Sequence, residues 1–470
     1  MTSTERPGPG TSGFGGTSDD GADIGLLSPQ WAATPVAHAT SDSAILQTML
    51  ETEVALVRAY EALGLAPVGV AGIVRDVAAA GGFDVASIAA RGRDGGNPVI
   101  PLVKDFRAAV AAVDGEAALW VHRGATSQDI LDTALMLVAR RAIQGLLVDV
   151  DTAVRSLSAL ADGHRRTLMV SRTLTQHGVP LVFGLKAAGW LGGVLHARRR
   201  LGSVTFPVQW GGAGGTLASF AVIGGPGTGI RLAEEMATML GLDTPSVPWQ
   251  TQRAPITGLG DALASLMDTL GTISSDVLVL ARPEIAELGE PTTAGRGGSS
   301  AMPQKHNPVL SVLIQSSARK APALSAELHR SANTVDERPD GAWHVEWQTL
   351  RELLRLVGAA AGLAAELVSG LVVHPDAMLR NLRLSGPLIV SERLMLEFGS
   401  LAGTARIQEL VSEAAGDKSF NLGSALRAEP ALASVSDARL AEALNPVAYL
   451  GECELLIDRV LGEVAEGRGS

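Results

Sequence analysis

Apolar residues recur at helical spacing through most of this chain. Within residues 129–161, apolar side chains return every three or four positions, for example at Ile130, Leu137 and Leu147, over about thirty residues. Comparable stripes fill residues 182–201, 258–285, 308–331 and 345–371. Several long helices with wide apolar stripes predict a bundle whose helices pack along their length. Such stripes also favour packing against other subunits, so we expect a homo-oligomer.

The N-terminal part of the chain shows shorter patterns. Residues 1–25 hold mainly Gly, Ser, Thr, Pro and Asp, which indicates a disordered tail. Residues 44–63 fit one amphipathic helix, with Met49 and Leu56 among its apolar residues and Glu53 among its polar ones. Asp42 precedes this helix at a position suited to an N-cap.

Composition supports helix packing against helix and narrows the classes of function. Of the 470 residues, 46% are apolar and only 4% are aromatic, which disfavours sheets. The net charge of −11 argues against a nucleic-acid surface. The uncharged run at residues 201–230 is long enough to span a membrane, but its glycines and prolines favour a buried irregular segment.

Cysteine and histidine usage argues against disulfides and metal sites. Cys453 is the single cysteine, so no intrachain disulfide forms, which suits a reducing cytoplasm. The nine histidines show no metal-ligand spacing. The N-terminus lacks a basic segment followed by an apolar core, so we read no signal peptide. We therefore expect a cytoplasmic protein with no metal, no other cofactor and no membrane partner.

The segment richest in chemistry is residues 297–308, with the sequence GGSSAMPQKHNP. Its glycines allow a mobile backbone, its serines supply hydroxyls, Lys305 supplies a positive charge, and Asn307 supplies a donor and an acceptor. A loop that carries a proton-transfer group and a carboxylate-binding cation is what chemistry on a small polyacid requires. We interpret it as part of an active site.

Two further segments are dense in polar side chains. In residues 124–129 (GATSQD), Thr126 and Ser127 stand where the longest predicted helix begins, and hydroxyls at a helix N-terminus favour anion binding. Thr126 and Asp129 also resemble a capping box. In residues 172–177 (RTLTQH), a polar cluster with His177 precedes Pro180, which we expect to start the next helix.

Downstream of the loop, Arg338 suits bidentate binding of a carboxylate. His344 follows within WHVEW (residues 343–347), where it is either an orienting hydrogen bonder or a packed side chain between tryptophans.

Together these segments resemble the fumarase/aspartase superfamily, over roughly residues 26–460. Within it the phrases GATSQD, RTLTQH, WHVEW and NPVIPLV (residues 97–103) look most similar to the 3-carboxy-cis,cis-muconate cycloisomerases. The resemblance implies an all-α fold with an N-terminal helical domain (26–122), a central long-helix bundle (123–371) and a C-terminal helical domain (372–470). It also implies a homotetramer with a 20-helix core, in which three subunits build each active site.

The resemblance also implies roles for individual residues. Ser300 is the proton-transfer residue, and His177 lies on the opposite side of the substrate. The residues implied to bind the substrate are Thr126, Ser127, Lys305, Asn307, Arg172, Gln176, Arg338 and Asn97. The reaction implied is a reversible β-addition or elimination on a di- or tricarboxylate through an aci-carboxylate intermediate, whose growing charge needs fixed donors and cations.

One departure from the superfamily pattern bears on the group added or expelled. Lyases that expel an amine pair their histidine with a glutamate twelve residues after the catalytic serine, where this chain has Val312. An amine must be protonated as it leaves, whereas a carboxylate or nitrite need not be. Val312 therefore favours a lactone-forming cycloisomerase or a lyase with a stable-anion leaving group.

The substrate stays open between two enzymatic alternatives. The first is 3-carboxy-cis,cis-muconate cycloisomerase activity, and the second is release of fumarate and nitrite from nitrosuccinate. Gln250, Gln304 and His306 depart from residues common in cycloisomerases and keep the second alternative open. A non-catalytic helical scaffold is a third reading, which the presence of Ser300 and Lys305 disfavours.

Overall fold

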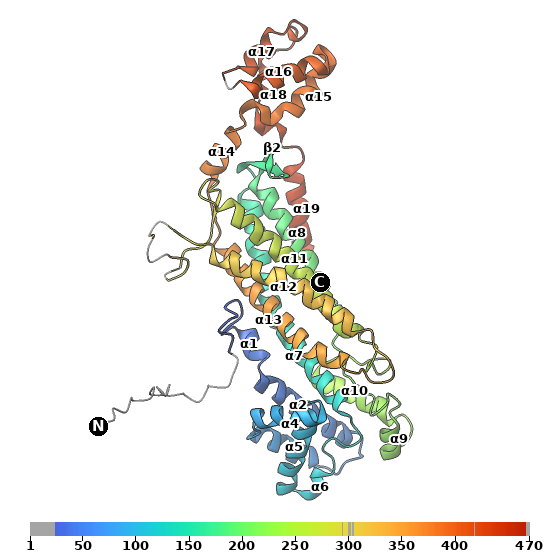
Figure 1. The fold of residues 1–470 in the computed structure, drawn as a ribbon. Coiled ribbons are helices and arrows are strands. Elements are labelled where there is room, and N and C mark those ends of the chain that lie inside the picture. The colour runs from blue at the N-terminus through green and yellow to red at the C-terminus, as the bar shows by residue number, and fades with distance from the viewer. Residues whose placement is uncertain (1–23, 294, 299–301, 303–304, 418, 467–470) are drawn as a thin grey trace, which may run out of the picture.

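The computed structural model describes residues 24–466, except 294, 299–301, 303–304 and 418. They form an elongated and almost wholly helical molecule, which confirms the all-α class (Figure 1). The N-terminal helices are α1 (Pro35–Ala39), α2 (Asp42–Ala62), α3 (Val70–Ala80), α4 (Val85–Gly95), α5 (Val99–Val113) and α6 (Gly115–Ala118). Apart from α1, they gather at one end of the molecule (Figure 1).

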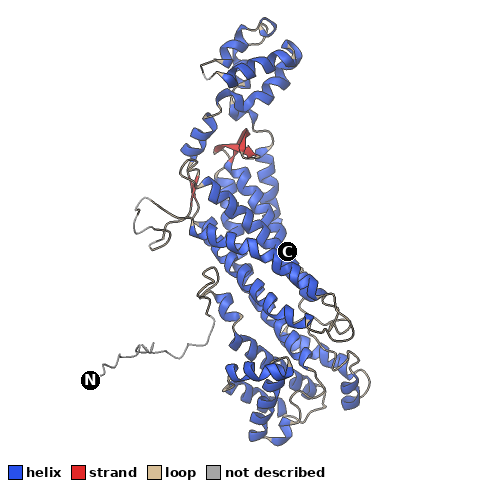
Figure 2. Ribbon diagram, viewed as in Figure 1, coloured by secondary structure: helices blue, strands red, loops and turns tan. Residues whose placement is uncertain are grey.

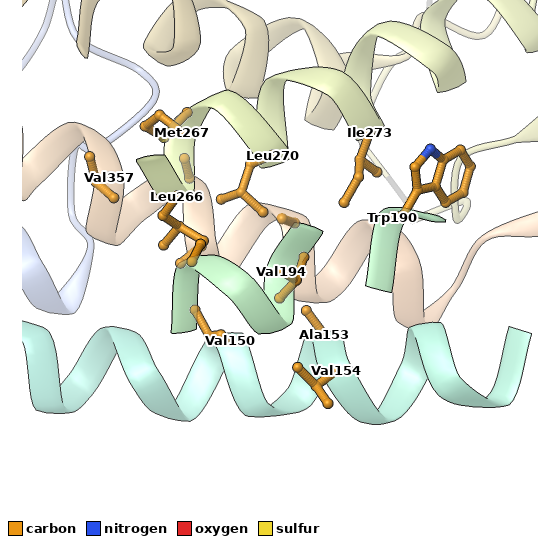
Figure 3. Close-up of a cluster of buried hydrophobic side chains, with 14 of the residues drawn as sticks. Val150, Ala153, Val154, Trp190, Val194, Leu266, Met267, Leu270, Ile273 and Val357 are labelled. Atoms are coloured by element: carbon orange, nitrogen blue, oxygen red, sulfur yellow. The ribbon is translucent and has the colours of Figure 1, made fainter. Parts of the chain in front are cut away.

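Five long helices make the central bundle: α7 (Ser127–Gly163), α8 (Phe183–Gly202), α11 (Ala254–Leu280), α12 (Val309–Ser331) and α13 (Ala342–Ser369). Each lies within a few residues of the helix that the apolar stripes predict. They contact one another in a closed order, α7 to α8, α8 to α11, α11 to α12, α12 to α13 and α13 back to α7. Figure 3 shows the core between them, where Val150 and Val154 of α7 lie near Val194 of α8 and Leu266 and Leu270 of α11.

The remaining elements extend the two ends of the bundle. Beside the N-terminal helices lie α9 (Ala218–Gly224) and α10 (Thr228–Leu240). The opposite end carries α14 (Pro375–Arg383), η1 (Gly386–Val390), α15 (Ser391–Ala402), α16 (Thr404–Gly416), α17 (Leu422–Ala428), η2 (Pro430–Leu432), α18 (Asp437–Ala443) and η3 (Pro446–Tyr449). The last helix, α19 (Cys453–Glu466), returns along the bundle beside α8 (Figure 1). Residues 394–443 contribute a separate apolar cluster, whereas Cys453, Ile457 and Val464 of α19 belong to the core of the central bundle.

The N-cap of α2 lies one residue earlier than the sequence pattern predicts. Ser41, not Asp42, is the N-cap: its backbone is extended and its hydroxyl accepts the Ala44 N–H at 3.2 Å. An N-cap residue must have non-helical backbone angles, and Asp42 is already the first helical residue. There its charge favours the positive end of the helix, and it pairs with Arg351 at 2.7 Å.

The helix expected at Pro180 is wrong, because this segment is a β-hairpin (Figure 2). Strands β1 (Leu168–Thr173) and β2 (Gln176–Val182) are antiparallel, Pro180 pairs with Val170, and α8 begins only at Phe183. The turn residues Leu174 and Thr175 both have left-handed φ, 46° and 71°, as a two-residue type I′ turn requires. Without Gly or Asn in the turn, the sequence carries no hairpin signal.

A second pair of short strands, β3 (Leu288–Gly289) and β4 (Val372–Val373), joins the end of α13 to the segment that enters the 297–308 loop. This pairing fixes where the loop starts. Nearby, Arg296 pairs with Glu366 of α13, so the described part of the loop lies at the C-terminal end of α13.

The apolar helix α11 is only partly covered within one chain. By length and composition it could cross a membrane, but half of its most apolar window is buried in the bundle. The exposed side borders a groove of about 390 Å³ between α8 and α11, lined in part by Lys186, Trp190 and Asp276. A core helix with one uncovered side is typical of a subunit that packs against others.

A glycine at the start of α8 allows a test of the tight packing between α7 and α8. A Cβ on Gly184 would lie 2.6 Å from the Ala161 carbonyl oxygen and 2.8 Å from that of His164. Because backbone atoms must move to admit it, we expect Gly184→Ala to lower the free energy of unfolding by about 1–3 kcal/mol. The matched control is Gly72→Ala in α3, where a Cβ meets nothing within 4 Å. Chemical denaturation should show the control neutral or stabilised by roughly 0.5–1 kcal/mol; equal effects would contradict the packing argument.

Candidate active site

The predicted site residues lie at opposite ends of the bundle within one chain. Thr126 immediately precedes α7, a helix of 37 residues that spans about 55 Å. The hairpin with His177 follows soon after the far end of α7. A rigid helix of this length excludes a site that contains both Thr126 and His177 of the same chain.

At the start of α7, the structure brings together two segments that are 212 residues apart. The Arg338 guanidinium donates to the Thr126 hydroxyl at 2.6 Å and to the Ala213 carbonyl at 3.4 Å. Ser127, half-buried, is the first residue of α7. Two hydroxyls, a guanidinium and the positive end of a long helix make this a location suited to a carboxylate.

Asp129 links the start of α7 to the segment at residues 211–212. Its carboxylate accepts the N–H groups of Thr126 (3.0 Å), Gly211 (2.9 Å) and Gly212 (3.0 Å). The bond to Thr126 confirms that half of the predicted capping box. Burial raises the Asp129 pKa to about 7, although the three N–H donors oppose that rise. The glycine-rich segment at residues 211–215 is thereby fixed against the start of α7, and Gln250 donates to the Gly212 carbonyl at 2.8 Å.

Asn97 and His344 also meet near this end. The side-chain oxygen of Asn97 accepts the Val99 N–H at 3.1 Å, and its nitrogen donates to the Gly95 carbonyl at 3.2 Å. His344 Nε2 lies 2.8 Å from the Gly96 carbonyl oxygen. Both side chains are thus engaged in shaping the entry to α5. The predicted substrate-binding role of Asn97 would require these local bonds to be exchanged.

Glu53 and His122 form a buried pair that no sequence motif indicates. Glu53 is not on a polar face as expected but fully buried, at 0% exposure. Its Oε1 lies 2.6 Å from His122 Nδ1, and its Oε2 accepts the His122 backbone N–H at 2.9 Å. Glu53 is four residues after Met49 and three before Leu56, so it shares their helix face. A carboxylate on an apolar stripe was the available signal, because it requires a buried partner.

The charge of this pair is set by its surroundings. Burial alone lowers the pKa of His122, but the charge and hydrogen bond of Glu53 outweigh it, so the His122 pKa is raised. The backbone of His122 has φ 55°, a left-handed value that places the imidazole against α2. The pair fixes the backbone of His122, four residues before Thr126, against α2.

At the other end of the bundle, the β1–β2 hairpin holds the second group of predicted residues. Arg172 forms two bonds to the buried Glu287, at 3.0 and 2.6 Å, so its guanidinium already has a carboxylate partner within the chain. Gln176 is exposed and donates to the Thr175 hydroxyl at 3.2 Å. Arg172 therefore acts on the hairpin's position, whereas Gln176 is free to turn towards a ligand.

His177 is half-buried, and its Nδ1 lies 2.8 Å from the Ser385 hydroxyl oxygen. Burial lowers the His177 pKa, the charge of Arg172 lowers it further, and Glu287 opposes both. Burial and the charge of Arg172 thus favour the neutral form of the His177 imidazole.

The loop contributes its two ends to the described residues, while Ser300 and Gln304 lie outside them. Asn307 donates from its backbone and its side chain to the Gly297 carbonyl, at 2.9 and 3.1 Å. Gly297 has φ +70°, and a Cβ there would lie 2.5 Å from the Asn307 carbonyl oxygen. Lys305 is exposed. Asn307 thus folds the loop, and Lys305 is available for a ligand from outside the chain.

Glu290 fixes the C-terminal end of the loop, where α12 begins. Its carboxylate accepts the N–H groups of Leu310 (3.0 Å) and Ser311 (2.7 Å) at the start of α12. Arg296 of the loop pairs with Glu366 near the end of α13, whereas Trp343 at the start of α13 donates to Asp132 near the start of α7. Glu366 and Trp343 are 23 residues apart on α13. The loop base is therefore about 35 Å from the Thr126 region. The Thr126 group therefore lies apart from the loop base in one chain, whereas the hairpin and the loop base lie close together, because Arg172 pairs with Glu287 just before β3.

Among the residues that the structure describes, no group of three or more His, Cys, Asp or Glu side chains is arranged to hold a metal ion. The three groups of predicted residues supply hydroxyls, imidazoles, guanidinium and ammonium groups. These groups suit acid–base steps and the stabilisation of negative oxygen.

Comparisons with known proteins find relatives that match nearly the whole chain. The sequence profile of a family described as Lyase matches residues 30–322. A nitrosuccinate lyase of Streptomyces davaonensis is 46% identical over 449 residues, 94% of this chain and 95% of that protein. A 3-carboxy-cis,cis-muconate cycloisomerase of Bradyrhizobium diazoefficiens is 38% identical over 444 residues, covering 93% and 97%. The solved 3-carboxy-cis,cis-muconate lactonizing enzyme of Pseudomonas putida has a TM-score of 0.85 and 32% identity, covering 93% and 98%.

The buried pair allows a test by stability and pH. Glu53→Gln leaves His122 without its charge partner, so we expect the free energy of unfolding to fall by about 3 kcal/mol. Because the folded pKa of His122 is raised, the charge contribution is fully present below about pH 6.5. It is lost as the pH rises through the raised value, so the difference from the unsubstituted protein should shrink there.

The matched control is Glu51→Gln, two residues away on α2, which removes an exposed pair with Arg141. It should cost less than about 1 kcal/mol at any pH. Denaturant titrations at fixed protein concentration give both values. A pH-independent loss for Glu53→Gln would mean that His122 is uncharged in the folded protein.

Proposed function

The chain belongs to the lyase family of the fumarase/aspartase superfamily, and we propose that it releases fumarate and nitrite from nitrosuccinate. It is an enzyme of that superfamily, so the reaction class is addition or elimination next to a carboxylate. The single observation that carries the choice of leaving group is His177: it is paired with a hydroxyl at 2.8 Å and its pKa is lowered. A neutral imidazole with an uncharged partner suits a leaving group that departs as a stable anion.

The proposed reaction needs one base and several fixed donors. Ser300, as its alkoxide, takes a proton from the carbon next to one carboxylate. The electron pair forms the C–C double bond, the C–N bond breaks with its pair, and nitrite leaves. Before the bond breaks, negative charge collects on the aci-carboxylate oxygens. Thr126, Ser127 and Arg338 at the α7 terminus, together with Lys305 of the loop, are the groups that would stabilise this charge.

Similarity also favours this substrate. The nitrosuccinate lyase is 46% identical across nearly the whole chain, whereas the Bradyrhizobium cycloisomerase is 38% identical over a similar length. The second candidate is 3-carboxy-cis,cis-muconate cycloisomerase activity, which the TM-score of 0.85 to the lactonizing enzyme supports. Closure of a lactone by the substrate's own carboxylate likewise needs no charged histidine, so the same residues serve either reaction.

We further propose that the active enzyme is a homotetramer whose sites combine groups from three chains. The length of α7 keeps Thr126 and His177 of one chain about 55 Å apart. Antiparallel packing of neighbouring bundles would bring the start of one α7 to the hairpin of another. The uncovered side of α11 and the α8–α11 groove offer apolar surface for that packing.

A paired assay tests the proposed reaction. The purified protein is incubated with nitrosuccinate and with 3-carboxy-cis,cis-muconate, while fumarate and nitrite release and loss of the diene are followed separately. We expect nitrite and fumarate in equal amounts. Ser300→Ala should reduce kcat about 100- to 10,000-fold because it removes the base, whereas the exposed Ser434→Ala should keep full activity. Diene loss without nitrite release would favour the cycloisomerase, and neither reaction would refute both.

Mixing of inactive variants tests the shared site. Ser300→Ala and His177→Asn are each expected to be nearly inactive as homotetramers. If one site takes these residues from different chains, co-refolded mixtures contain some sites with both residues intact and recover activity. Mixtures of two differently tagged Ser300→Ala proteins are the control and should stay inactive. Mixed tetramers isolated by both tags, yet without recovered activity, would contradict sites shared between chains.

A further inference from the structure

The structure carries two histidines with opposite kinds of partner. His122 Nδ1 faces the carboxylate of Glu53 at 2.6 Å, and its pKa is raised. His177 Nδ1 faces the hydroxyl of Ser385 at 2.8 Å, and its pKa is lowered. The difference between the partners matters because a carboxylate favours the charged imidazolium, whereas a hydroxyl can also donate a hydrogen bond to the neutral ring.

Ser385 comes from a part of the chain to which neither motif nor spacing drew attention. It stands between α14 and η1, 208 residues after His177. Asn381 in the last turn of α14 donates to the Glu287 carboxylate at 2.8 Å, and Glu287 holds Arg172 of the hairpin. The same short segment therefore anchors the hairpin and presents the hydroxyl to its histidine.

We propose that Ser385 is the positioning residue of His177, which it holds through an uncharged hydroxyl. This inference rests on the proposed function in taking His177 as a site residue. The Ser385 O–H donates to Nδ1, so Nε2 carries the hydrogen and is presented to the substrate as a neutral donor. A neutral N–H binds the oxygens of a departing anion without having to transfer its proton.

The charged groups around the ring agree with this assignment. Arg172 and Glu287 form an ion pair with each other, so neither is left to act as a proton partner of His177. Position 312 is valine, half exposed, on the first turn of α12. The turn of the hairpin is also held in place. Leu174 and Thr175 have left-handed φ angles, which the flanking strands and the Arg172–Glu287 ion pair must maintain.

Four variants test the inference in the full-length protein. Ser385→Ala removes the bond, Ser385→Thr keeps a hydroxyl, Ser385→Asp supplies a carboxylate, and Ser400→Ala on the exposed side of α15 is the control. The protonation of His177 is read without substrate, from the pH dependence of its modification by diethyl pyrocarbonate, quantified by peptide mass spectrometry. The pH dependence of kcat and KM is measured with nitrosuccinate.

For the unsubstituted protein and for Ser385→Thr, the modification midpoint should lie below the ordinary histidine value of about 6.5. Ser385→Asp should move the midpoint, and the acid limb of kcat, to higher pH. Ser385→Ala should lower kcat roughly tenfold with little change in KM, the order of one neutral hydrogen bond lost from the reacting state. The Ser400→Ala control should match the unsubstituted protein in every measurement.

An unmoved midpoint in a folded Ser385→Asp protein would overturn the inference, as would an unchanged kcat in Ser385→Ala. Folding of each variant is checked by its circular dichroism and its oligomer size, and Ser385→Thr gives a second variant that keeps the hydroxyl. If the midpoint shifts as expected but nitrosuccinate is not converted, the pairing of Ser385 with His177 stands. The proposed function then fails by itself.

Discussion

The uninterrupted length of α7 is the constraint on which the rest of the structure depends. A helix of 37 residues cannot bend its ends together, so the polar group at its start and the hairpin beyond its end must serve different sites. The other long helices follow its direction and bury its middle in an apolar core. Polar chemistry is therefore confined to the ends of the bundle and to the loop beside α13. In the proposed homotetramer, neighbouring chains would complete each site.

A buried ion network fixes the positions of α11 and α13 relative to α7. Arg253, at the start of α11, bonds Asp132 of α7 and Glu346 of α13, with side-chain exposures of at most 2%. Trp343 Nε1 donates to the same Asp132 at 2.8 Å. Replacement by apolar residues could be equally stable, so the network is better understood as specifying register. That register is what brings Arg338, just before α13, to the hydroxyl of Thr126.

The sequence predicted the long helices well because each buries one stripe, and burial imposes the helical period on the residues that it covers. The hairpin escaped notice because Leu174 and Thr175 adopt a turn usually made by Gly or Asn. Glu53 was predicted to be exposed because it is charged, but it is buried beside His122. Motifs identified Thr126, His177 and Lys305 as candidates, but the pairings with Arg338 and Ser385 join residues more than 200 positions apart. Only the packing of the bundle determines such contacts.

The two histidines have opposite kinds of partner, and the difference bears on the proposed reaction. Near Thr126, burial lowers the pKa of His122 but the carboxylate of Glu53 outweighs it, and the two groups form an ion pair whose charges offset each other. Attraction for a substrate carboxylate at that end therefore rests on the N-terminus of α7 and on Arg338. At the hairpin, burial and the charge of Arg172 lower the pKa of His177, and its partner is an uncharged hydroxyl. In the proposed reaction, a neutral imidazole would let the product anion leave more readily than an imidazolium, because it adds no positive charge to the binding of that anion.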